Sequence, residues 1–441
     1  MNRAGWALAV LFLVNTLNFF DRQVIAAVVE PLRREWRLTD AQVGWIGTAF
    51  TLLYAVVGLP LGRLADTWSR RALLCAGALL WTSTTALSAL ATGFRTLFAA
   101  RLAVGVGEAV CAPASTSLLA DLFPEARRGR ATSVFMLGLP VGLGLSYAVS
   151  GAVAQAFGWR AAFLVAGVPG VLLALLCLTL PEPARGAAEP EPIGSRRRPG
   201  SAIALLLRTP TFLWIVVSGA LHNFNMYALS LFLPALLTRR HGLDVREAGL
   251  VSGVVFGVAG GIGMLLGGWA SDRAVAWRPD GRLLTAAVAL GAVAPLAIAF
   301  LGQAPGPRVS TGVLLCLAVL PLYVYYAPVY ATLQEIVEPS LRGTAMAVYF
   351  FAMYLLGASL GPVGTGALSD ALAARAASLA GAAAIDERAR AAGLHQALYL
   401  VPFLSAMLGV VLWAGSRAVK RDKQALRAWM SLNKNQLQPS A

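Results

Sequence analysis

The chain has 441 residues, of which 58% are hydrophobic and only 13% are charged. A water-soluble domain carries roughly 25% charged residues, so this composition excludes a soluble globule and indicates an integral membrane protein. The formal net charge of +15 is compatible with a nucleic-acid partner or with membrane topology, and the positions of the basic residues must decide between them.

Twelve stretches along the chain are long and apolar enough to cross a bilayer, which takes about 20 residues per helix. In chain order, the predicted helices cover residues 5–29, 42–61, 72–92, 96–120, 131–156, 161–180, 211–237, 248–270, 283–301, 311–333, 344–369 and 395–415. The first stretch is predicted to stay in the protein as a helix and not to be removed as a signal peptide, because no small-residue cleavage site follows it. The sequence therefore predicts an all-α integral membrane fold with twelve transmembrane helices.

Most lysines and arginines lie in the loops on the side of the two termini. By the positive-inside rule this side is cytoplasmic, which predicts a multi-pass inner-membrane protein with both termini in the cytoplasm. Topology thus accounts for the basic charge, and no nucleic-acid partner is expected. The four cysteines lie inside predicted helices without metal-ligand spacing, so no metal site and no disulfide framework is predicted.

Two loop types recur six helices apart. GRLADTWSRR (62–71) is matched by GGWASDR (267–273), and DLFPEARRGRA (121–131) by EPSLRGTA (338–345). Such a repeat predicts two pseudo-symmetric six-helix bundles. The predicted domains are an N-terminal bundle (1–180), a cytoplasmic linker (181–208) rich in Pro, Gly and charge, a C-terminal bundle (209–415) and a basic tail (416–441).

Two six-helix halves with a cytoplasmic connector resemble the major facilitator superfamily, in which the binding site lies near the bilayer midplane between the halves. In the repeated loops, Gly permits close helix contact, Asp accepts hydrogen bonds, and Arg can pair with acids across the cytoplasmic mouth. Positive-inside anchoring alone explains the arginines but not the repeated Gly-x-x-x-Asp. The predicted gating residues are Gly62, Asp66, Arg70, Arg71, Asp121, Arg130, Asp272 and Arg273.

Four ionisable residues fall well inside the predicted helices, namely Asp21, Arg22, Arg101 and Glu108. Each costs on the order of 3 kcal/mol at bilayer depth, so such residues usually face a cavity and mark function. A buried carboxylate beside cations can alternate between charged and neutral forms. Glu108, then Asp21, are the predicted proton-binding groups, with Arg101 organising them. A purely structural tie between two helices is the alternative, although small residues would serve at lower cost.

Arg22 is the predicted cation for an anionic head group, because a guanidinium matches phosphate or carboxylate bidentately. The second half has no charges deep in its helices and carries tyrosines at helical spacing instead. A charged half facing an aromatic half suits an amphiphile, although tyrosine stripes as often serve packing. The other predicted substrate contacts are Asn18, Asn223, Tyr227, Tyr323, Tyr326, Tyr330 and Tyr354.

The first half resembles the spinster family, whose members are proton-linked transporters of lysophospholipids and sphingosine phosphate. The resemblance is carried by LNFFDRQ (17–23), GRLADTWSRR, RLAVGVGEA (101–109), LLADLF (118–123), LPVGLGLSY (139–147), GWR (158–160) and PEPARGA (181–187). It implies coupling and head-group roles for Asp21, Arg22 and Glu108. The second half matches only at superfamily level, and the external connection 370–394 is not assigned beyond a candidate surface helix.

Other functions are less favoured. GASLG (357–361) fits the G-x-S-x-G pattern of a hydrolase nucleophile, but no strand precedes it, so no enzyme and no cofactor is expected. His222 is expected to be packed or to line a cavity. A receptor would not need a balanced buried charge network. The predicted function is proton-coupled transport of an anionic lipid by a monomer in contact with membrane lipid, the alternative being a symporter or exporter of small organic anions.

Overall fold

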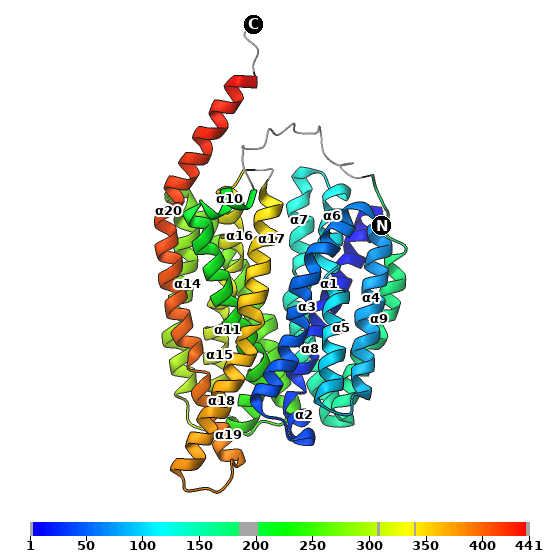
Figure 1. The fold of residues 1–441 in the computed structure, drawn as a ribbon, viewed down its shortest axis with the longest axis vertical. Coiled ribbons are helices and arrows are strands. Elements are labelled where there is room, and N and C mark those ends of the chain that lie inside the picture. Colours follow the sequence, from blue (N-terminus) through cyan, green and yellow to red (C-terminus); the bar gives the residue numbers. More distant parts are fainter. Residues whose placement is uncertain (1–2, 185–201, 307–308, 339–340, 438–441) are drawn as a thin grey trace.

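The structure is a computed structural model that describes residues 3–184, 202–306, 309–338 and 341–437. In these ranges the regular structure is helical, and twelve helical segments are long and apolar enough to cross a membrane. The predicted all-α fold with twelve transmembrane helices is therefore confirmed. In Figure 1 the helices run side by side along the long axis, and both termini lie at one end of the bundle.

The N-terminal half is built from nine α-helices. They are α1 (Arg3–Ala27), α2 (Val29–Trp36), α3 (Asp40–Thr67), α4 (Arg70–Leu87), α5 (Phe94–Glu108), α6 (Cys111–Leu122), α7 (Glu125–Met136), α8 (Gly138–Phe157) and α9 (Trp159–Cys177). Helix α3 begins with a capping box, in which Thr39 and Gln42 satisfy each other's backbone amides. Helices α5 and α6 together form one crossing.

The C-terminal half contains two π-helical segments. Its elements are α10 (Ala202–Leu207), α11 (Pro210–His241), α12 (Val245–Gly253), η2 (Val254–Ala259), α13 (Gly260–Trp277), α14 (Gly281–Leu301), α15 (Val309–Val324), α16 (Tyr326–Glu335), α17 (Arg342–Ala352), η4 (Met353–Ala358), α18 (Leu360–Leu379), α19 (Glu387–Ala397) and α20 (Leu400–Leu437). The π-segments interrupt the crossings 245–277 and 342–379 in mid-course, where such bulges often mark functional sites.

The two halves pack against each other most closely at the end that carries α2 and α19, here called the α2–α19 end; the opposite end, with both termini, is called the terminal end (Figure 1). One apolar core lies within the N-terminal half around Leu74, Trp81 and Leu118. A larger core runs through both halves and includes Leu32 and Leu231.

Several helices extend beyond their predicted ends. Helix α11 continues to His241 and stops at Gly242, whose φ of 71° favours glycine. Helix α18 continues through an alanine-rich stretch to Leu379, and α19 occupies much of the unassigned connection. Helix α20 carries the predicted basic tail onward to Leu437. Hydropathy marks where the lipid ends, whereas a helix ends where a stop signal occurs, so the two boundaries differ.

Candidate functional site

The four ionisable residues predicted inside the N-terminal half come together between α1 and α5. Asp21, Arg101 and Glu108 are at most 1% exposed, and Arg22 is 5% exposed. The Nε atom of Arg22 donates to Oε2 of Glu108 at 2.6 Å. Arg101 donates to the backbone carbonyls of Asp21 at 3.3 Å and Arg22 at 3.4 Å. Arg101 thus holds the backbone of α1 in place, while Arg22 carries the direct ion pair with Glu108.

Three carboxyl oxygens of this cluster have no hydrogen-bond donor among the described residues. They are both side-chain oxygens of Asp21 and Oε1 of Glu108, and the amide nitrogen of Asn18 is likewise without a partner. Buried polar atoms in proteins are almost always hydrogen-bonded, and exceptions occur at sites that bind or react. The site therefore has acceptor capacity for a proton or for a donor group of a substrate.

Aromatic rings from both halves surround Arg22. Its guanidinium lies 4.8 Å from the ring centre of Phe19, 5.1 Å from Phe50 and 4.8 Å from Tyr54. Its Nη1 atom donates to the hydroxyl of Tyr354, on the π-segment η4, at 3.2 Å. Arg22 therefore links a carboxylate of its own half to a phenol of the other half.

Tyr354 and Tyr227 complete this aromatic shell from the C-terminal half. The ring of Tyr354 lies 4.7 Å from Tyr54 and 6.3 Å from Tyr227, and Tyr227 stacks on Phe50 at 6.2 Å. Phe50 and Tyr54 were not predicted from the sequence, because the predicted membrane span 42–61 contains no charge to draw attention to them. Their spacing of four residues, which puts both rings on one helix face, is the signal that could have found them.

The remaining predicted tyrosines form a second cluster inside the C-terminal half. His222 stacks on Tyr325 at 4.0 Å and meets Tyr326 edge-on at 5.1 Å. Tyr326 in turn contacts Tyr330 at 5.9 Å. Both ring nitrogens of His222 are buried with no hydrogen-bond partner among the described residues. This cluster supplies polar atoms within an aromatic environment, and Tyr326 and Tyr330 are close enough to Tyr354 to interact electrostatically with the Arg22 shell.

Two predicted substrate contacts pack within the C-terminal half. Tyr323 is 1% exposed, and its ring covers Gly260, where a Cβ would come within 2.9 Å. Asn223 is 2% exposed and donates to the carbonyl of Gly219 at 3.0 Å. In this conformation both side chains contact neighbouring parts of the C-terminal half. Their contact with substrate remains a prediction.

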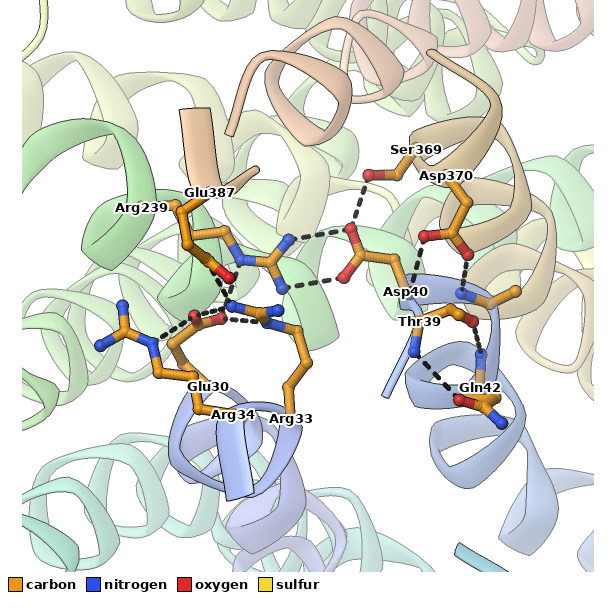
Figure 2. A network of polar contacts seen from close by, with 11 residues as sticks. Glu30, Arg33, Arg34, Thr39, Asp40, Gln42, Arg239, Ser369, Asp370 and Glu387 are labelled. Atoms are coloured by element: carbon orange, nitrogen blue, oxygen red, sulfur yellow. Dashed lines mark hydrogen bonds and ion pairs between the residues drawn. The ribbon is translucent and has the colours of Figure 1, made fainter. Parts of the chain in front are cut away.

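Ion pairs connect the two halves at the α2–α19 end, as Figure 2 shows. Arg239 of α11 donates through Nε to Glu30 at 2.8 Å and through both Nη atoms to Asp40, each at 2.8 Å. All three side chains are at most 4% exposed. The prediction of an uncharged C-terminal half placed Arg239 beyond the helix end, whereas α11 carries it into this buried site.

Further contacts of the same network reinforce the link between the halves (Figure 2). Arg33 of α2 donates to Glu387 of α19 at 2.7 Å. The carboxylate of Asp370 accepts the backbone amides of Asp40 at 3.0 Å and Ala41 at 2.8 Å, at the start of α3. A carboxylate at a helix N-terminus is favoured by unpaired amides and by the helix dipole.

The arginines control the ionisation of Glu30. Burial raises the pKa of its carboxyl, but hydrogen bonds and charge from Arg33 and Arg239 outweigh that effect and hold the pKa at about 2. Glu30 therefore stays charged at any physiological pH, and the ion pairs of the α2–α19 end persist with it.

Glycines let helices of opposite halves touch backbone to backbone, both at this end and in the middle of the crossings. A Cβ on Gly366 of α18 would lie 2.2 Å from the carbonyl oxygen of Asp40, and one on Gly44 of α3 would lie 2.4 Å from that of Pro362. On the other side of the interface, Gly144 of α8 faces Gly257 of η2, and a Cβ added to Gly144 would lie 3.1 Å from the opposing Cα. These contacts use the Gly-rich segments 138–144 and 357–366.

The predicted gate at the terminal end forms contacts within the N-terminal half. Arg70 is 1% exposed, pairs with Asp121, and donates through Nε to Glu182 at 3.0 Å. Glu182 also accepts the backbone amide of Arg71 at 3.2 Å. Burial raises the pKa of Glu182, but the Ser69 hydroxyl and the amide and guanidinium of Arg70 lower it to about 2. Glu182 was not predicted; its signal was the acid in PEP directly after the sixth helix.

Two other predicted gating residues, Asp272 and Arg273, make their described contacts within the C-terminal half. Asp272 pairs with Arg282 at 2.6 Å within the C-terminal half, and Arg273 lies over the ring of Trp269 at 5.0 Å. Arg130 is exposed, and the surroundings of Gly62 and of the Asp66 side chain lie outside what the structure describes. Several hydrogen bonds join the halves in the region from Arg22 to the α2–α19 end. Gating by the terminal-end loops remains a prediction.

Two six-helix halves around a buried charged site are the architecture of transporters of the major facilitator type. The model of the Major Facilitator Superfamily matches residues 11–362. An MFS-type efflux pump of Mycolicibacterium smegmatis is 33% identical over 433 residues, covering 95% of this chain and 94% of that protein. Human protein spinster homolog 3 is 31% identical over 396 residues, covering 85% of this chain and 77% of that protein.

A solved relative has the same architecture. The crystal structure of a bacterial homolog to the human lysosomal transporter Spinster, in an inward-facing and occupied conformation, is 26% identical. It covers 96% of this chain and 98% of its own, with a TM-score of 0.83. The chain belongs to the Major Facilitator Superfamily and is spinster-like. The members of this family are transporters rather than enzymes, and they use no bound cofactor. No group of three or more His, Cys, Asp and Glu side chains suited to a metal ion occurs among the described residues.

Proposed function

We propose that the protein is a secondary active transporter that couples proton movement to the transport of an amphiphilic anionic lipid, such as a lysophospholipid or sphingosine phosphate. The observation that carries the proposal is Arg22, which joins Glu108 of one half to Tyr354 of the other inside an aromatic shell. An anionic head group would compete with Glu108 for the guanidinium, and the rings would accept the apolar chain.

Proton coupling follows from the same competition. When Glu108 gains a proton its attraction for Arg22 weakens, and the guanidinium becomes available to an anionic head group. Asp21, whose two oxygens lack a donor among the described residues, is a second acceptor, next to Arg22 in the chain. In this proposal Arg101 positions α1 and does not contact the substrate. Protonation of Glu108 is thus coupled to binding of the head group by Arg22.

The conformation fits one stage of alternating access. The halves are joined by ion pairs and glycine contacts at the α2–α19 end, which the positive-inside rule makes the external end. The structural relatives at 26% and 27% identity are both inward-facing. We infer that the present structure is likewise closed to the outside, with both termini in the cytoplasm of a cell with an inner membrane.

The test is uptake and release of a lysophospholipid in proteoliposomes, with and without an imposed pH gradient. The wild-type protein should show transport that responds to the gradient, and Glu108→Gln should lose that response while folding normally. Glu35→Gln, a half-exposed carboxylate paired with Arg160, is the matched control and should keep it. Gradient-dependent transport by Glu108→Gln would remove Glu108 from the mechanism.

A second candidate is export of small organic anions, favoured by the 33% identity to an efflux pump. The two candidates differ in the ligand that stabilises the purified protein. Lysophospholipids should raise the melting temperature under the lipid proposal, and small carboxylates should not. Stabilisation by small carboxylates alone would replace the lipid proposal with this one.

A further inference from the structure

One face of α20 is apolar in the first part of the helix and basic further along. Phe403, Val410 and Trp413 are 65%, 62% and 46% exposed, as expected for side chains that face lipid. They recur at helical spacing, and the same stripe continues beyond them. Its next members are Arg417, Lys420, Gln424 and Arg427, all exposed, with Arg421 beside them. The lipid-facing surface of the helix therefore becomes a basic surface, here called the α20 basic face.

Contacts on the opposite side of α20 fix the depth of this basic face. Asp422 is 8% exposed and accepts the backbone amide of Thr211, in the first turn of α11, at 2.9 Å. Lys423 donates to the carbonyl of Pro279 at 3.0 Å and pairs with Glu335, the last residue of α16, at 2.6 Å. Residues 422 and 423 thus lie level with the terminal ends of neighbouring crossings.

The rise of 1.5 Å per residue places the basic face around that level. Arg417 lies about 8 Å toward the membrane interior and Arg427 about 8 Å toward the water. This is the depth of the lipid head groups, which flank a hydrocarbon core of about 30 Å. Figure 1 shows α20 continuing past the ends of the other helices at the terminal end. Arg417 also lies over the ring of Trp413, with 3.7 Å from its guanidinium carbon to the ring centre, as at a membrane interface.

The charge of this face is uncompensated. Asp422 is turned toward the bundle, and Lys423 is already paired with Glu335. Arg417, Lys420 and Arg427 have no carboxylate partner among the described residues, whereas Arg421 shares a cavity wall with Glu338 and Asp422. Such a set of cations beside lipid attracts anionic head groups, at about 1 kcal/mol per residue near the surface.

A neighbouring cavity is a weaker candidate for the same ligand. It has a volume of ≈ 260 Å³ and lies between α10 and α20, with Arg208 and Arg421 in its wall. Glu338 and Asp422 line it as well, so its formal charges cancel. The exposed stripe, by contrast, contains no acid.

We propose that the α20 basic face binds the head groups of anionic phospholipids in the leaflet on the side of the two termini. This site is separate from the buried Arg22 site, and the inference holds whichever substrate is transported. Binding at this face would hold α20, the last crossing helix, at the membrane surface on the side of the two termini.

The test compares two variants with the same change of charge. In the first, Arg417, Lys420, Arg421 and Arg427 are each replaced by Gln. In the control, four exposed arginines at the α2–α19 end, Arg95, Arg246, Arg375 and Arg388, are each replaced by Gln. Retention of phosphatidylglycerol relative to phosphatidylcholine with the same chains is measured by native mass spectrometry of the full-length protein in detergent. Melting temperatures show whether each variant is folded.

The wild-type and control proteins should both prefer phosphatidylglycerol, and the α20 variant should lose at least about fivefold of that preference, because one such cation contributes roughly this factor. An Arg22→Gln variant should keep the preference, which separates this site from the substrate site. Equal preference in the α20 variant and the wild type, or an equal loss in the control, would overturn the inference. Loss in Arg22→Gln alone would overturn it as well, by assigning the lipid to the buried site.

Discussion

Arg22 has two partners that come from different halves of the molecule. Its Nε atom is 2.6 Å from Glu108, and its Nη1 atom is 3.2 Å from the hydroxyl of Tyr354. A guanidinium can hold both because its donors point in fixed, separate directions. The ion pair belongs to one half, while the phenol contact depends on how the halves are arranged. The hydrogen bonding of Arg22, and with it the binding of substrate, therefore depends on the conformation of the transporter.

Tyr354→Phe should separate these two partners. The substitution keeps the ring against Tyr54 and removes one hydrogen bond to a charged donor, which is worth about 1.5–3 kcal/mol. We expect roughly tenfold weaker substrate binding with the gradient response intact, measured by binding and by proteoliposome transport. Tyr399→Phe, on the exposed side of the C-terminal half, is the control and should bind as the wild type does. Unchanged affinity in Tyr354→Phe would place the substrate elsewhere.

At the scale of the elements, helices of opposite halves approach each other through glycines. Gly366 of α18 lies against the start of α3, and Gly144 of α8 lies against Gly257 of η2. At these glycines no side chains interdigitate between the two helices. One backbone can therefore separate from the other without disrupting packed side chains there. The π-segments η2 and η4 lie in the two C-terminal crossings that make these contacts.

Gly366→Ala should weaken the closed arrangement. The new Cβ would lie 2.2 Å from the carbonyl oxygen of Asp40, and overpacking of this kind costs about 1–3 kcal/mol. The protein should remain folded but favour separation of α18 from α3, which raises solvent access at the α2–α19 end. Hydrogen exchange at the start of α3 measures the change.

Gly291→Ala is the matched control, because a Cβ there meets nothing within 4 Å and only gains helix propensity. It should leave the exchange unchanged and the protein at least as stable as the wild type. Equal exchange in both alanine variants and the wild type would show that the contact of α18 with α3 does not limit opening.

At the scale of the whole molecule, the closed end depends on one cation of the C-terminal half. Arg239 is placed between Glu30 and Asp40 of the other half, and all three are buried. A buried ion pair contributes modestly to stability, but removing one partner leaves an uncompensated charge and costs about 3–5 kcal/mol. The network therefore disfavours partial opening, because Asp40 would lose its cation while still buried, whereas Glu30 would keep Arg33 and Arg34 of its own half.

Arg239→Gln should shift the population toward an open α2–α19 end, because Asp40 is then a buried carboxylate without its cation and gains from hydration, while Glu30 keeps Arg33 and Arg34 and no longer links the halves through Arg239. Spin labels at Thr92 and Ala384, exposed residues of opposite halves at this end, measure the separation. Arg240→Gln is the control, since Arg240 donates to the carbonyl of Gln303, within its own half. The same distance distribution in Arg239→Gln and wild type would mean that the ion pairs do not hold this end closed.

The pH dependence of this end follows from Glu30. Its pKa is held at about 2, below the ordinary value of 4.5. Its contribution to the stability of the closed end is therefore complete above pH 4.5 and is lost as the pH falls toward 2. The label separation should therefore stay constant between about pH 8 and pH 5. If the end opens within that range, and Glu30→Gln abolishes the change, Glu30 is a physiological pH sensor after all.

The sequence by itself determined the class of fold and the most unusual residues. Charge-free stretches of about 20 residues require lipid as the solvent, and the repeated loops require two related halves, so twelve helices in two bundles followed without coordinates. Asp21, Arg22, Arg101 and Glu108 were identifiable because charge at bilayer depth is costly and therefore rare. That they meet was expected because buried charges need partners of opposite sign.

Only the tertiary structure decided which residues join the halves. Arg239 reads as an ordinary basic residue at a helix end, and Glu30, Asp40 and Asp370 read as loop residues; their pairing depends on which helices become neighbours. Tyr54 and Phe50 gained significance only when α3 was placed beside Arg22. Hydropathy and spacing describe one helix at a time, whereas a contact between halves depends on two, and for that reason the closed end could not be found in the sequence.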